Sequence, residues 1–92
     1  MAKDKKKTSA EINQIVDGLM NVDNLRREYD VVAHAASVLG KVLDATSNDD
    51  SIIKKLGEEQ YSHICRQRGL AMEYRDILAV RICLLEHDNK KD

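Results

Sequence analysis

LRREYDVVAHAASVLGKVL, residues 25–43, carries the strongest structural signal in the chain. Its apolar residues recur at spacings of three and four, the period of a helix with one buried face. A second stripe, at positions 27, 30, 34, 37, 41 and 44, is polar throughout. The stretch therefore predicts a central amphipathic helix that keeps one edge in water.

The flanking segments predict shorter helices separated by polar turns. Thr8 and Glu11 have the spacing of a capping box, so a first helix is expected to start at Thr8. The cluster NVDN at 21–24 supplies side-chain oxygens that end this helix and cap the central one. After the polar turn at 45–50, a third helix is expected from about Ser51.

Gly69 leaves the path of the C-terminal third open. An interior glycine costs a helix only about 1 kcal/mol relative to alanine. The chain can therefore break at Gly69 or continue as one helix to His87, and we favour a break or kink. Together these segments predict an all-α fold, a small bundle of three to four helices.

The composition agrees with one small helical domain. The chain has 92 residues, no proline, three Tyr and no Phe or Trp. Its core must therefore be built from aliphatic side chains, which suit packed helices. We expect a disordered basic arm over residues 1–7, a helical domain over residues 8–87 and a disordered polar tail over residues 88–92.

The C-terminal segment ILAVRICLL, residues 77–85, contains a single charged residue, Arg81. A helix that is apolar nearly all round should be buried nearly all round. A domain of this size buries only about 60–65% of its unfolded surface, so we expect the bundle to be completed by self-association or by a permanent partner. The expected contact residues combine aromatic, arginine and aliphatic side chains: Tyr74, Leu78, Arg81, Ile82 and Leu85.

Arg81 has two possible roles within this segment. Its neighbours one turn away on a helix are all aliphatic. Its long stem is expected either to lie over core residues or to bring the guanidinium to a carboxylate across an interface.

A metal site is not expected. His63, Cys65, Cys83 and His87 are of the types that bind zinc. However, His63 and Cys65 are two positions apart, so they point in nearly opposite directions on a helix and cannot share one ion.

Catalysis is not expected either, and no cofactor is implied. Glu73 and Asp76 form one ExxD pair, but the second acidic pair that metal-dependent hydrolysis in a helical bundle needs is missing. No glycine loop for phosphates and no nucleophile elbow occurs in the sequence.

Nucleic-acid binding is the alternative hypothesis, in which a basic arm and a group of arginines near Gly69 reach phosphates. The formal net charge of −1 and the acidic Glu73 and Asp76 nearby weigh against it. The candidate contacts are Lys5, Lys6, Lys7, Arg66 and Arg68, with Arg75 beside them.

The favoured prediction is a small non-catalytic accessory protein that binds through its apolar C-terminal helix. It would act as an adaptor, an inhibitor or a regulatory subunit, as a homodimer or with a larger protein partner. Two cysteines are too few for a disulfide scaffold, and neither a signal peptide nor a stretch of about 20 apolar residues is present. We therefore expect a cytoplasmic protein that does not contact a membrane.

Overall fold

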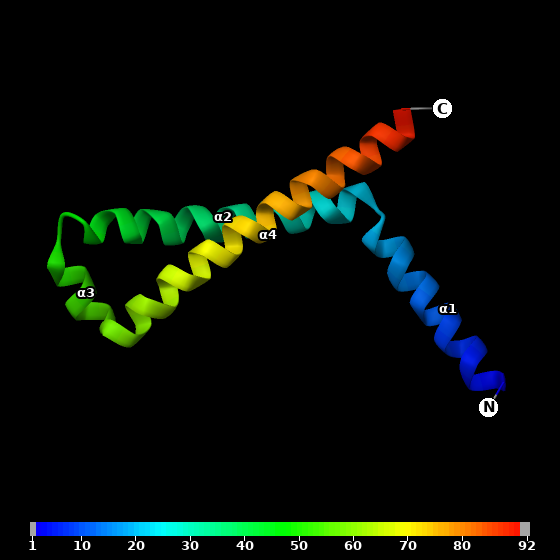
Figure 1. The fold of residues 1–92 in the computed structure, drawn as a ribbon, viewed down its shortest axis with the longest axis horizontal. Helices are drawn as coiled ribbons and strands as arrows, with labels where there is room; N and C mark the ends of the chain where they lie inside the picture. Colours follow the sequence, from blue (N-terminus) through cyan, green and yellow to red (C-terminus); the bar gives the residue numbers. More distant parts are fainter. Residues whose placement is uncertain (1, 91–92) are drawn as a thin grey trace.

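Four helices make up the chain in the computed structural model, which describes the backbone of residues 2–90 and the side chains of residues 9–88 (Figure 1). No strand occurs within the described backbone, so the predicted all-α class is confirmed. The helices are α1 (Ala2–Leu19), α2 (Val22–Thr46), α3 (Asp50–Leu56) and α4 (Glu58–Lys90).

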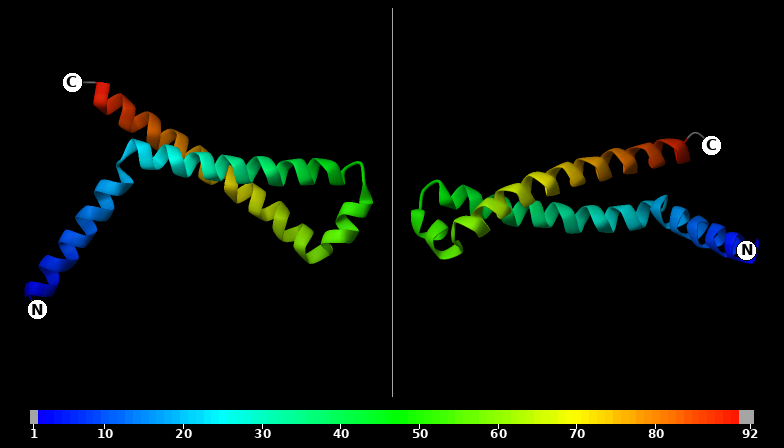
Figure 2. Two further views of the ribbon diagram at one scale, coloured as in Figure 1. Left: turned by 180° about the vertical axis from the view of Figure 1, so that it is seen from behind. Right: turned by 60° about the horizontal axis from the view of Figure 1, so that its bottom comes forward.

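The two long helices, α2 and α4, form the body of the molecule. They run in opposite directions and cross one another (Figures 1 and 2). Leu25 and Ala36 of α2 and Leu78 of α4 are the buried hydrophobic side chains of the described residues. Arg26 near the start of α2 forms an ion pair with Glu86 near the end of α4. The predicted central helix at 25–43 is thus confirmed, and α4 is its packing partner.

The turn between α1 and α2 follows the predicted cap. The Asn21 side chain accepts a hydrogen bond from the backbone N–H of Asn24 (2.9 Å), and the Asn24 side chain donates to the carbonyl oxygen of Gly18 (3.3 Å). Only Met20 and Asn21 separate the two helices. From this turn α1 extends away from the α2–α4 pair (Figure 1).

The predicted start of the first helix at Thr8 is wrong, because α1 begins at Ala2. Alanine and lysine are good helix formers, and no glycine or proline precedes Thr8 to stop the helix. The disordered arm expected over residues 1–7 and the tail expected over 88–92 fall mainly on residues whose side chains are not described. Both stay predictions.

Gly57, rather than Gly69, separates the last two helices. The predicted start of the third helix near Ser51 is confirmed by α3, but the expected continuation to Gly69 is wrong, because α3 ends at Leu56. Its cap Asp49 accepts hydrogen bonds from the backbone N–H (2.9 Å) and hydroxyl (2.6 Å) of Ser51. Gly57 follows with a φ of 87°, a conformation that residues with a Cβ rarely adopt.

The favoured break at Gly69 is wrong, since α4 runs through it without interruption over 33 residues. The penalty of one interior glycine is about 1 kcal/mol, which packing of both halves of α4 against other helices outweighs.

The molecule is thin and extended. Its extents are 59 × 39 × 14 Å, and its radius of gyration is 19.3 Å, against about 12 Å for a compact chain of 92 residues. Packed helix axes lie about 8–10 Å apart, so the shortest extent has room for two stacked helices only. Within the described residues, no further layer covers the outer faces of α2 and α4.

Candidate interaction surface

The C-terminal half of α4 leaves part of the apolar run uncovered. Leu78 is fully buried, whereas Ile77, Val80 and Leu84 are 58%, 58% and 60% exposed. Exposed apolar residues continue from these three toward the middle of the helix, on the side of α4 turned away from α2. We call this set the α4 stripe: Leu70, Tyr74, Ile77, Val80 and Leu84.

Helix α1 carries a second uncovered apolar face. Its members recur at helical spacing and are each 45–56% exposed. Side-chain hydrogen bonds join α1 to the rest of the described chain only at its C-terminal end, at Gly18 and Leu19. We call this set, including the residue after the helix, the α1 stripe: Ile12, Ile15, Val16, Leu19 and Met20.

The two stripes meet where α1 ends. Met20 of the α1 stripe and Leu84 of the α4 stripe line one surface hollow of about 260 Å³, together with Arg81, Leu85 and Asp88. The apolar surface is therefore continuous from α1 to the C-terminal half of α4.

Of the contact residues predicted from the sequence, some are exposed in the structure and others are buried. Tyr74 is 44% exposed and belongs to the α4 stripe. Leu78 is a core residue, so its prediction as a surface contact is wrong. Ile82 is half-buried and lines a hollow with Tyr29 of α2. Leu85 is half-buried and lines another hollow with Met20. The sequence could not select the outer face, because nearly every position of ILAVRICLL is apolar.

Arg81 has a contact that neither predicted role included. Its guanidinium donates a hydrogen bond to the carbonyl oxygen of Leu19. This carbonyl lies in the last turn of α1, where a helix has no backbone donor of its own. Arg81 therefore ties the end of α1 to α4, and it supplies a positive charge at the negative end of the α1 dipole.

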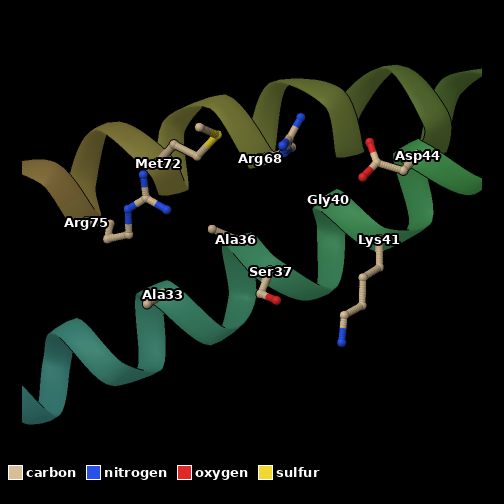
Figure 3. A pocket seen from close by; sticks show the side chains of 9 residues that line it. All are labelled: Ala33, Ala36, Ser37, Gly40, Lys41, Asp44, Arg68, Met72 and Arg75. Atoms are coloured by element: carbon tan, nitrogen blue, oxygen red, sulfur yellow. The ribbon is translucent and has the colours of Figure 1, made fainter.

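The crossing of α2 and α4 holds a cavity of about 360 Å³, shown in Figure 3. Arg68 packs over Gly40 there, and its Nε is buried without a hydrogen-bond partner. Arg75 also lines this cavity and forms an ion pair with Asp76 (3.2 Å). Lys41 points away from α4 (Figure 3).

The two predicted arginine contacts for nucleic acid, Arg66 and Arg68, do not share one exposed surface. Arg66 is exposed on α4, whereas Arg68 turns into the helix crossing two positions later. The side chains of Lys5, Lys6 and Lys7 lie outside the described residues. Nucleic-acid binding therefore gains no geometric support from the arginines.

The potential zinc ligands lie far apart along one helix. Because α4 is continuous through Gly69, Cys65 and Cys83 are separated by about 27 Å at about 1.5 Å per residue. Within the side chains described, no cluster of three or more His, Cys, Asp or Glu residues is placed to hold a metal ion. Both cysteines are exposed and free.

Known proteins give no further guide. Comparison with protein-family models, curated proteins and solved structures found no match. Of the helices described, none is both long and apolar enough to cross a membrane.

Among the side chains that the structure describes, two ionisable groups have a shifted pKa, and both serve the fold. A hydrogen bond from Arg26 to Glu86, together with the Glu86 charge, raises the pKa of Arg26. Hydrogen bonds from the hydroxyl and the backbone N–H of Ser51 lower the pKa of Asp49. The first pair joins the ends of α2 and α4, and the second caps α3.

Proposed function

We propose that this chain is a non-catalytic protein-interaction module that binds through the α1 and α4 stripes. The exposure of Ile77, Val80 and Leu84 carries the proposal. Each aliphatic side chain gains about 1.5–3 kcal/mol when it is removed from water. A continuous apolar surface on a small protein is typical of a protein–protein contact.

The character of the surface fits binding by an adaptor, an inhibitor or a regulatory subunit. Tyr74 is the aromatic member of the α4 stripe and is 44% exposed. A tyrosine offers a large, rigid contact area with a hydroxyl at its tip, and such residues are enriched among the anchors of interfaces.

Site-specific photo-crosslinking tests this function in cells of the source organism. A photoreactive amino acid replaces Leu84 in the α4 stripe or, as a matched control, His34, which is exposed on α2. We expect one or a few discrete adducts from position 84 and none from position 34. Identical adducts from both positions, or no adduct from position 84 or from Ile77, would contradict the proposal.

A further inference from the structure

We infer that the surface is occupied by a second copy of this chain, and that the two copies exchange their α1 helices. The α1 stripe of each copy then lies on the α4 stripe of the other. This inference rests on the proposed function and names its partner.

The accessible area of the chain has the size that such a dimer needs. The chain exposes 7590 Å², whereas a compact monomer of 10.4 kDa exposes about 5,400 Å². The excess is about 2,200 Å² per chain. Two copies that each bury this excess form an interface of about 4,400 Å², within the range of about 2,000–5,000 Å² typical of obligate homodimers.

The two stripes fit one another in pattern, and the α4 stripe is long enough to take the whole α1 stripe. At about 1.5 Å per residue, the α1 stripe from Ile12 to Met20 is about 12 Å long, and the α4 stripe from Leu70 to Leu84 is about 21 Å long. Both stripes have the spacing of three and four residues by which helices interdigitate. A two-fold axis that places one α1 on the partner's α4 places the other pair as well, so each α1 stripe is covered together with a little over half the length of each α4 stripe.

The connection between α1 and α2 favours contact between copies over contact within one chain. Only Met20 and Asn21 separate the helices. The carbonyl oxygens of Gly18 and Leu19 are held by Asn24 and Arg81. An α1 that turned back along its own α4 would lose these hydrogen bonds, and short connections of this kind favour exchange of an element between protomers.

Light scattering and sedimentation equilibrium on the full chain test the inference. We expect a mass twice the 10.4 kDa of the chain. Ile15→Asp in the α1 stripe and Ile77→Asp in the α4 stripe each place a charge in the interface twice by symmetry. Each should weaken the dimer at least about 100-fold in Kd, with the helical circular dichroism of α2 and α4 retained.

Matched controls on the same helices are Asn13→Asp on α1 and Ser62→Asp on α4, both at exposed polar positions. These variants should remain dimeric. Isotope-filtered NMR on a mixture of labelled and unlabelled chains should show contacts between the methyl groups of Ile12 or Ile15 and those of Ile77 or Val80. Such contacts arise only between copies.

Several outcomes would overturn the inference. A wild-type chain that is monomeric at 100-fold dilution and at high concentration alike excludes the second copy. A dimer that survives both Ile15→Asp and Ile77→Asp, or that lacks the filtered contacts, excludes the exchange of α1. If the chain is monomeric but position 84 still gives a discrete adduct with another protein, the proposed function holds and the homodimer is excluded. If the chain is monomeric and position 84 gives no adduct, both the proposed function and the homodimer are excluded.

Discussion

Arg68 of α4 lies across Gly40 of α2, and a Cβ on residue 40 would stand 3.2 Å from its Nε. This contact is tighter than ordinary van der Waals packing. The glycine therefore lets the arginine stem and guanidinium pass between the helices where they cross. Gly69 differs, because no atom lies within 4 Å of a Cβ built there.

The two glycines should consequently respond in opposite directions to substitution. Gly40→Leu must displace Arg68 or spread the crossing, so it should lower the free energy of unfolding by about 1–3 kcal/mol. Gly69→Ala should raise it by about 0.5–1 kcal/mol, since it removes backbone freedom inside a helix at an open position. Urea unfolding followed by circular dichroism measures both values. Equal effects of the two variants would show that the crossing is looser than described.

Leu78 should be a residue of the fold. Leu78 on α4 is fully buried, whereas Val31 on α2 is 70% exposed. Leu78→Ala should lower the free energy of unfolding by about 2–5 kcal/mol, and the control Val31→Ala should change it by less than about 0.5 kcal/mol. Chemical denaturation at matched protein concentration makes the comparison. If the unfolding curve of Leu78→Ala matched that of the wild-type chain, Leu78 would not be a core residue.

Arg81 should hold the end of α1. Replacing it with Met keeps the stem and removes the donor to the Leu19 carbonyl, a loss of about 0.5–1.5 kcal/mol for a partly exposed hydrogen bond. Hydrogen exchange should therefore become faster in the last turn of α1 and remain unchanged in the middle of α2. If the amides of α1 keep their wild-type exchange rates, the tie contributes nothing.

Acidification should remove the cap of α3. The hydroxyl of Ser51 and then its backbone N–H hold the pKa of Asp49 below its ordinary value. A carboxyl with a lowered pKa in the folded state stabilises that state above its unfolded pKa, and this contribution is lost as the pH falls below about 4. Carboxyl carbon NMR titration should find the lowered pKa.

The Ser51→Ala variant isolates the cause of this shift. It removes the hydroxyl donor and leaves the backbone donor, so the pKa of Asp49 should rise toward its ordinary value without reaching it. An unchanged Asp49 titration in Ser51→Ala would assign the shift to another group.

The sequence predicted those parts of the fold that depend on local chemistry. The spacing within residues 25–43 is repeated over several turns and has one interpretation, and the Asn21 cap needs only residues close to it. Gly57 and Gly69 could not be ranked, because the decisive difference is a positive φ at Gly57, which arises from the corner between α3 and α4. The amino-acid sequence alone does not distinguish a glycine at a bend from a glycine that a helix tolerates.

The sequence predicted which segment carries the candidate surface, but it did not predict which face of the helix is exposed. ILAVRICLL is apolar on nearly all sides, so the choice of Leu78 for the interior and Ile77 for the exterior depends on the angle at which α2 meets α4. The exposure of the α1 stripe depends in the same way on the direction in which α1 leaves its turn, which no local pattern encodes.

The continuity of α4 through Gly69 has a mechanical consequence. At about 1.5 Å per residue, its 33 residues form a rod about 50 Å long, and Gly57 lies at one end of it. A rotation of about 5° around that corner would move the far end by about 4 Å, because an unbroken helix transmits tilt along its whole length. Gly57 thus lies at the opposite end of this rod from the exposed apolar residues Ile77, Val80 and Leu84.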